Sequence, residues 1–321
     1  MESFLETLWD TLTSVSIPLL LLGIAFQTVQ TLFVALAWRN ILRASWPDGG
    51  DGVSYRNVLG YYAGGCGLNS FLPASAGTVA MLGLYRTNIK GATVAGLVGA
   101  TVVENIFFAV MAAIVYGYLF IEAAGSFDVK FGWFDSHWGA TLLIVVAGTA
   151  LTVLVIRMLW HKLHHTWELA KDGGVIVRQP RKFMVEVVGV EMLSYVARMG
   201  VNATFMYAYD IPVSVKNVFL IVAASSISST VALAPGAVGA QTALANVALA
   251  GVATQAEISA YSISQSVITT AWSALFGLTM LARTIGWDQT KKLMHKKKEE
   301  EEQDSADASA DAVAPEGAGG T

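Results

Sequence analysis

Long hydrophobic runs separated by short charged segments make up most of this chain. Runs of about 18 or more apolar residues are typical of membrane-spanning helices. Five such runs are long enough, and each ends where Lys, Arg, Asp or Glu reappears. They are residues 15–38, 91–121, 139–159, 183–209 and 258–282.

Two further uncharged stretches, 57–85 and 217–252, are each interrupted by a Pro-x-x-x-Gly pattern. Proline lacks a backbone donor and clashes with the preceding helical turn, so each helix should stop at its proline and restart beyond it. The first arm, 57–72, would be about 24 Å long as a helix, which is shorter than a hydrocarbon core of about 30 Å. Half-membrane hairpins therefore fit better than full spans. The two patterns are Pro73-Ala-Ser-Ala-Gly77 and Pro235-Gly-Ala-Val-Gly239.

The distribution of Lys and Arg assigns sides to these segments, because cytoplasmic loops are enriched in them. Segment 39–56 contains three bases and segment 157–182 contains six, whereas the loop 122–137 is acidic. The first two are placed inside, and the acidic loop and the N-terminus are placed outside. The stretch 57–85 then enters and leaves from the inside, and 217–252 from the outside.

These assignments predict an all-α polytopic membrane protein with an inverted-topology repeat, about five full spans and two opposed re-entrant hairpins. The alternative treats each hairpin as two tight spans and gives nine helices. We expect a single transmembrane domain over 1–282, in a multi-pass arrangement in the cell membrane. Its parts are half one at 15–121, a connecting span at 139–159, half two at 183–282, and a basic, then acidic, disordered cytoplasmic tail at 283–321.

Composition agrees with a membrane protein. The chain is 54% hydrophobic and 14% charged, whereas soluble domains carry about a quarter charged residues. Nucleotide-binding, zinc-protease and hydrolase motifs are absent from the sequence. The three histidines at 161–165 lie in a basic stretch that favours a helix at the level of the lipid head groups over a metal site. We therefore expect no enzyme, no cofactor, no metal and no nucleic-acid partner.

The two broken stretches are the candidate substrate site. Irregular backbone inside a membrane is tolerated where it lines a protein-covered or watery cavity. Helices that restart after a proline also present unpaired N–H groups, which suit an anionic head group. The candidate substrate-binding residues are Asn69, Pro73, Ser75, Gly77, Thr78, Glu104, Pro235, Gly236, Gly239, Gln241, Thr242 and Gln265.

Three ionisable residues lie deep in hydrophobic runs, where charge is costly and usually functional or paired. Glu104 lies 31 residues after Pro73, and Gln265 lies 30 residues after Pro235, so the repeat puts polar groups at matching depths. Glu191 and Arg198 lie on one helical face. An ion pair between Arg198 and either Glu191 or Glu104 is one expectation, and a proton-binding or substrate-binding role for Glu104 is the other.

Four places between about residues 36 and 282 carry a resemblance to a known family. The chain resembles the transmembrane region of lysylphosphatidylglycerol synthases and its stand-alone flippase-like relatives. The similar places are Leu42-Arg43-Ala44-Ser45-Trp46, Asn69-Ser-Phe-Leu-Pro73-Ala-Ser-Ala-Gly77, Glu104, and Leu233-Ala-Pro235-Gly-Ala-Val-Gly239.

Charged positions of the family pattern are neutral here. Ser75 and Thr78 stand for an Arg and a Glu, Asn105 stands for an Arg, and Gln241 and Thr242 stand for an Arg and a Glu. The resemblance implies translocation of a lipid, while lysine transfer is not expected because only a short polar tail follows residue 298.

The functional hypothesis is a flippase-like protein that moves a lipid or polyprenyl-linked lipid with a polar or anionic head group between leaflets. The alternative is a non-transporting membrane scaffold for an enzyme of cell-envelope lipid or glycan biosynthesis. The expected partners are accordingly a membrane lipid and, in the alternative, such an enzyme.

Overall fold

The computed structural model describes residues 16–70, 76–124, 172–231 and 237–291. Long helices carry the chain from one end of the molecule to the other: α2 (Ile17–Ser45), α5 (Val94–Ala124) and α12 (Gln255–Ile285). In the part of the chain that the structure describes, these are the helices long and apolar enough to cross a membrane. They confirm the spans predicted at 15–38, 91–121 and 258–282, although α2 continues through Trp38 to Ser45.

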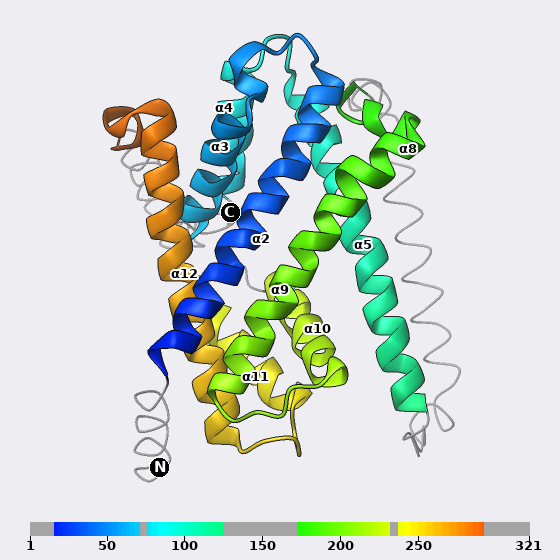
Figure 1. Cartoon of the computed structure of the whole chain (residues 1–321), viewed down its shortest axis with the longest axis vertical. Helices are drawn as coiled ribbons and strands as arrows, with labels where there is room; N and C mark the ends of the chain where they lie inside the picture. The colour runs from blue at the N-terminus through cyan, green and yellow to red at the C-terminus, as the bar shows by residue number, and fades with distance from the viewer. Residues whose placement is uncertain (1–15, 71–75, 125–171, 232–236, 292–321) are drawn as a thin grey trace, which may run out of the picture.

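The two interrupted stretches form four shorter helices. The first stretch forms α3 (Tyr55–Asn69) and α4 (Ala76–Asn88), and the second forms α10 (Val215–Val231) and α11 (Ala237–Ala248). The predicted interruptions are therefore confirmed, while Pro73, Ser75, Pro235 and Gly236 lie outside the described residues. Figure 1 shows α3 and α4 toward one end of the long axis and α10 and α11 toward the other.

The predicted span 183–209 begins with a π-helical turn, η3 (Phe183–Val188), and continues as α9 (Gly189–Ala208). Short turns precede it: η1 (Gly50–Val53) lies between α2 and α3, while η2 (Val175–Arg178) and α8 (Pro180–Lys182) lead into η3. The predicted connecting span 139–159 and the tail after residue 291 lie outside the described residues.

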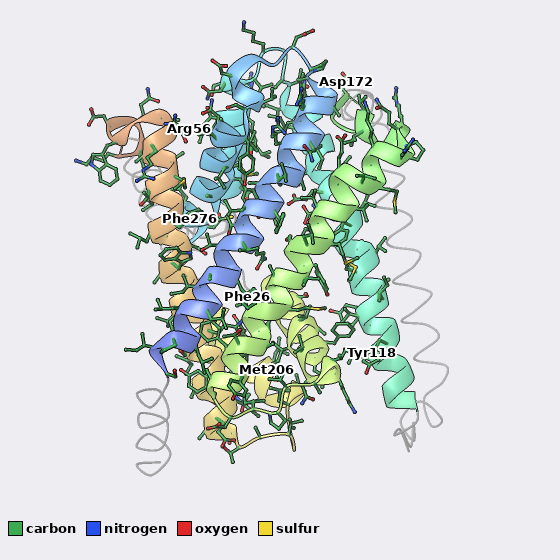
Figure 2. The ribbon with its side chains drawn as sticks, in the orientation of Figure 1. Phe26, Arg56, Tyr118, Asp172, Met206 and Phe276 are labelled. Atoms are coloured by element: carbon green, nitrogen blue, oxygen red, sulfur yellow. The ribbon has the colours of Figure 1, made fainter. Side chains whose placement is uncertain are left out.

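Glycines let α2 and α9 approach closely. A Cβ on Gly200 would overlap the ring of Phe26, and a Cβ on Gly23 would overlap the ring of Phe205. Each phenylalanine therefore fills the space that a glycine leaves on the facing helix. Figure 2 shows Phe26 on α2, in the region where this helix runs beside α9.

A glycine also lets α3 and α12 approach closely, since a Cβ on Gly277 would overlap the carbonyl oxygen of Ala63. The buried apolar side chains form separate clusters along the molecule. One surrounds Trp38 and Tyr85, and another surrounds Phe205 and Tyr261. Polar side chains buried among apolar ones are costly without a partner, so their mutual hydrogen bonds help to fix their positions.

Candidate functional site

A polar cavity of about 250 Å³ lies between α2, α9, α10, α11 and α12. Most of its walls are amides, hydroxyls and one guanidinium, which is unusual inside a bundle of apolar helices. The lining residues are Gln27 and Gln30 of α2, Arg198, Val201 and Asn202 of α9, Ser225 of α10, Gln241 of α11, and Gln265 and Thr269 of α12.

Helical spacing places these side chains on the cavity. Residues three or four positions apart share a face of a helix, as Gln27 and Gln30 do on α2, and as Arg198 and Asn202 do on α9. The Asn202 side chain also donates to the carbonyl of Arg198 at 2.8 Å. These two helices, α2 and α9, therefore each present neighbouring polar side chains to the cavity.

Hydrogen bonds between helices hold the walls in place. Asn202 Oδ1 accepts from Gln265 Nε2 at 3.0 Å and from the Tyr261 hydroxyl at 3.2 Å. Ser266 donates to Gln241 Oε1 at 2.9 Å. The side-chain oxygen of Gln265, Oε1, is buried and accepts no hydrogen bond within the described residues.

Arg198 supplies the positive charge of the cavity. Its Nη2 donates to Ser225 Oγ at 3.3 Å. Neither carboxylate oxygen of Glu191 has a hydrogen-bond partner in the described part of the chain. The expected Glu191–Arg198 ion pair is therefore not formed, because seven residues separate the two by about 10 Å along the helix and Arg198 turns toward α10.

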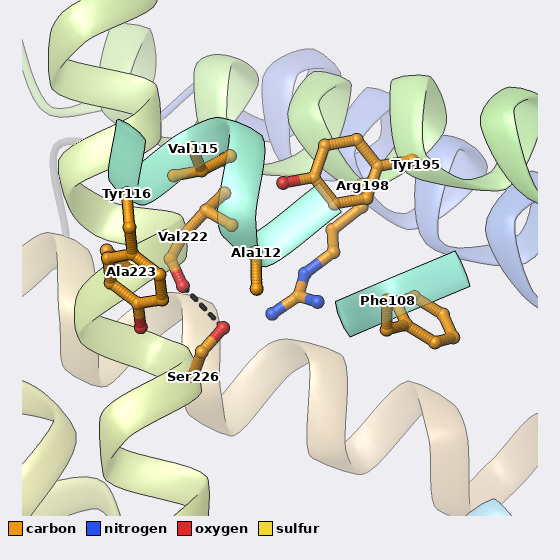
Figure 3. A pocket seen from close by; sticks show the side chains of 9 residues that line it. All are labelled: Phe108, Ala112, Val115, Tyr116, Tyr195, Arg198, Val222, Ala223 and Ser226. Carbon is orange, nitrogen blue, oxygen red and sulfur yellow. Dashed lines mark hydrogen bonds between the residues drawn. The ribbon is translucent and has the colours of Figure 1, made fainter. Parts of the chain in front are cut away.

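The Arg198 guanidinium also borders a second, more apolar cavity of about 160 Å³ between α5, α9 and α10. Figure 3 shows it extending from α9 into the space beside Phe108 and Ala112 of α5. The opposite wall is formed by α10, where Ser226 donates to the carbonyl of Val222 at 2.8 Å. Arg198 thus lines both the polar and the more apolar cavity, which is the arrangement that an amphipathic ligand requires.

The described residues of the first predicted break, Asn69, Gly77 and Thr78, lie together and do not line this cavity. Asn69 Oδ1 accepts from the Gly77 backbone N–H at 2.7 Å, and Asn69 Nδ2 donates to Thr78 Oγ1 at 3.2 Å. An amide side chain in this position satisfies an N–H group in the first turn of α4. The Gly77 N–H, which had been expected to face an anion, therefore donates to Asn69 instead.

The residues predicted at the second break divide between the cavity and its support. Gln241 and Gln265 line the cavity. Thr242 Oγ1 donates to Ser262 Oγ at 3.2 Å, which ties α11 to α12. Gly239 is exposed, and no heavy atom lies within 4 Å of the position that its Cβ would take.

Glu104 does not line the polar cavity. Its carboxylate lies beside the Trp38 indole, and its charge acts on Glu191. The matching depths predicted for Glu104 and Gln265 therefore do not bring the two into one site. Instead, the structure separates a region with two acids from a region with one base.

Several lining residues were missed from the sequence: Gln27, Gln30, Asn202, Ser225 and Thr269. Neutral polar residues are common enough in membrane helices that a single one carries little signal. Their spacing could have drawn attention, since Gln27 and Gln30 share a helical face, as do Arg198 and Asn202. Which faces meet, however, is decided by tertiary packing.

Comparison with known proteins identifies one family. The sequence model described as "Lysylphosphatidylglycerol synthase TM region" matches residues 3–277. No curated protein and no solved structure matches the chain.

Proposed function

Since the chain belongs to the lysylphosphatidylglycerol synthase transmembrane-region family, a non-catalytic membrane domain linked to lipid handling, we propose that it moves a lipid with an anionic head group between membrane leaflets. The observation that carries the proposal is the position of Arg198 between a polar and an apolar cavity.

The polar cavity suits a phosphate-containing head group. A guanidinium binds phosphate oxygens through charge-assisted hydrogen bonds, and Arg198 has a neutral hydroxyl rather than a carboxylate as its side-chain partner. Gln27, Gln30 and Gln241 supply further hydrogen-bonding groups on other walls. An uncompensated Arg inside a membrane is costly, and a bound anion would remove that cost.

The apolar cavity suits the start of an acyl or polyprenyl chain. Its walls include Phe108, Val115 and Val222, from α5 and α10. A lipid bound with its phosphate at Arg198 would then place its head in one space and its chain in the other. This arrangement would favour a lipid over free phosphate, because free phosphate has no apolar part to fill the second cavity.

The short helices support a route for the head group across the membrane. At about 1.5 Å per residue, α3, α4, α10 and α11 are all shorter than a hydrocarbon core of about 30 Å. We propose that α3–α4 and α10–α11 are half-membrane hairpins that enter from opposite faces, related by an inverted repeat. The bias of Lys and Arg favours an external N-terminus and a cytoplasmic tail in the cell membrane.

The test is lipid movement in vesicles that contain the purified full chain. A phosphatidylglycerol with a fluorescent acyl chain is compared with an equally labelled zwitterionic lipid, and movement is measured as the fraction that an impermeant quencher can reach. We expect the anionic lipid to move faster, and the Arg198→Gln variant to lose at least 90% of this movement while Arg198→Lys retains part of it.

The matched control is Arg181→Gln, which removes an exposed arginine near the start of the same helical segment. It should leave movement unchanged. Wild-type movement that survives Arg198→Gln would contradict the proposed site. A folded wild-type chain that moves neither lipid would contradict transport and favour the scaffold hypothesis.

A further inference from the structure

Glu191 is a fully buried acid without a partner. Its exposed fraction is 0%, and neither carboxylate oxygen has a hydrogen-bond partner among the described residues. An ionised carboxylate in this position would carry a large desolvation cost. Because no partner lies among the described residues, a bound proton is the simplest means of neutralising Glu191.

Glu104 of α5 and Glu191 of α9 lie near each other, beside a contact between the two helices. The rings of Phe107 and Tyr195 contact edge to face with centroids 6.3 Å apart. Phe107 follows Glu104 by three residues and Tyr195 follows Glu191 by four, so each acid lies one turn before the contact, on the same helical face. The charge of Glu104 acts on Glu191 accordingly.

The described side chains that surround the two acids are an indole, a thiol and phenols. Trp38 of α2 lies beside Glu104, and its buried indole N–H has no hydrogen-bond acceptor among the described residues. Tyr62 and Cys66 of α3 and Tyr85 of α4 complete the surroundings. Within the described residues, neither Arg39 of α2 nor Arg198 of α9 donates a hydrogen bond to the Glu191 carboxylate.

We propose that Glu104 and Glu191 form a proton-binding pair that holds one proton between them, and that this proton couples to binding of the anionic head group at Arg198. Two adjacent carboxylates in an apolar site, without a cation, cannot both ionise. Indole, thiol and phenol neighbours do not provide the six or more oxygen ligands that Ca²⁺ prefers. The only bond that forms and breaks is one carboxyl O–H, and the proton is exchanged with water.

The coupling rests on the proposed function and on the helix that both sites share. Glu191 lies two turns before Arg198 on α9, about 10 Å along its axis. Loss of the shared proton would add one negative charge to the pair, which would then attract Arg198 more strongly and compete with an anionic ligand; binding of the proton would weaken this competition. At this separation and an effective dielectric constant of about 20, proton binding would strengthen anion binding on the order of tenfold.

The proton site is tested without transport, by infrared difference spectroscopy of the purified full chain as a function of pH. We expect the absorption of a protonated carboxylic acid in the wild type at neutral pH. The single variants Glu104→Gln and Glu191→Gln should each alter its titration, and the double variant should abolish it. Glu186→Gln, which changes an exposed acid five residues before Glu191, is the matched control and should leave it intact.

Four outcomes would overturn the proton pair. The absorption would be absent from the wild type, it would survive in the double variant, or it would respond to one of the two single variants alone. Displacement of the proton by Na⁺ at constant pH would also overturn it, because the site would then be a cation site. Because an amide has nearly the shape of a carboxyl group and adds no charge to an apolar site, each variant should remain folded, and thermal unfolding checks this.

The coupling is tested by binding of a short-chain phosphatidylglycerol to the same proteins. Wild-type affinity should fall on the order of tenfold as the pair loses its proton, and the double variant should bind with an affinity independent of pH. A pH-independent wild type would overturn the coupling. If the chain binds no anionic lipid but keeps the infrared titration, the proposed function fails while the proton pair stands.

Discussion

Gln265 of α12 donates a hydrogen bond to Asn202 of α9 at 3.0 Å, although 63 residues separate them in the chain. The hydroxyl of Tyr261 donates to the same oxygen. Asn202 therefore accepts hydrogen bonds from two side chains of α12 and fixes one wall of the polar cavity. A single amide thus ties the binding space to the packing of two helices.

Replacing Asn202 with Ala should destabilise the protein by about 1–3 kcal/mol, because it leaves two buried donors without an acceptor. The measurement is thermal or denaturant unfolding in detergent. Asn105→Ala is the control, since this exposed side chain donates to a carbonyl of its own helix. Equal stability of the two variants would show that the Asn202 contacts contribute little.

Replacing Gly277 with Ala should destabilise the protein by about 1–3 kcal/mol, because the added methyl overlaps the backbone of α3 and overpacks the interface. Gly83→Ala is the matched control. Gly83 lies in α4, and its added Cβ would have no heavy atom within 4 Å, so that variant should be neutral or slightly more stable. An unfolding curve in detergent compares the two, and an unchanged Gly277→Ala would contradict the close approach of α3 and α12.

Removing the Asn69 side chain should cost about 1 kcal/mol, the usual value for a lost helix cap. In Asn69→Ala, the Gly77 N–H and the Thr78 hydroxyl lose their partner. Hydrogen exchange at the start of α4 should rise more than exchange at its end. Asn88→Ala, which removes an exposed amide at the other end of α4, should produce the reverse pattern.

Filling the apolar cavity should slow lipid movement without preventing head-group binding. Ala112 lines this cavity, and a phenylalanine there would occupy the space assigned to the lipid chain. We expect Ala112→Phe to reduce movement at least fivefold while the chain still binds glycerol phosphate. Ala113→Phe, on the exposed side of α5, should move lipid at the wild-type rate, and equal effects of both would contradict the assignment.

Much of the fold could be predicted from local properties of the sequence. Hydrophobic length predicted α2, α5 and α12, because backbone groups in lipid must be satisfied within their own helix. The two prolines predicted that 57–85 and 217–252 would each form two short helices, because proline interrupts the backbone hydrogen bonds of a helix. These effects depend on neighbours within a few residues, so they can be recognised without tertiary structure.

The candidate site depended on contacts that no local pattern contains. The sequence placed Glu191 and Arg198 on one face of one helix, yet the side chains serve different surroundings: Arg198 bonds Ser225 of α10, whereas Glu191 lies near Glu104 of α5. Gln27 of α2 joins the cavity from the far end of the sequence. A polar group buried in an apolar bundle is costly unless it forms a hydrogen bond, and the packing of the helices determines which partners lie within reach.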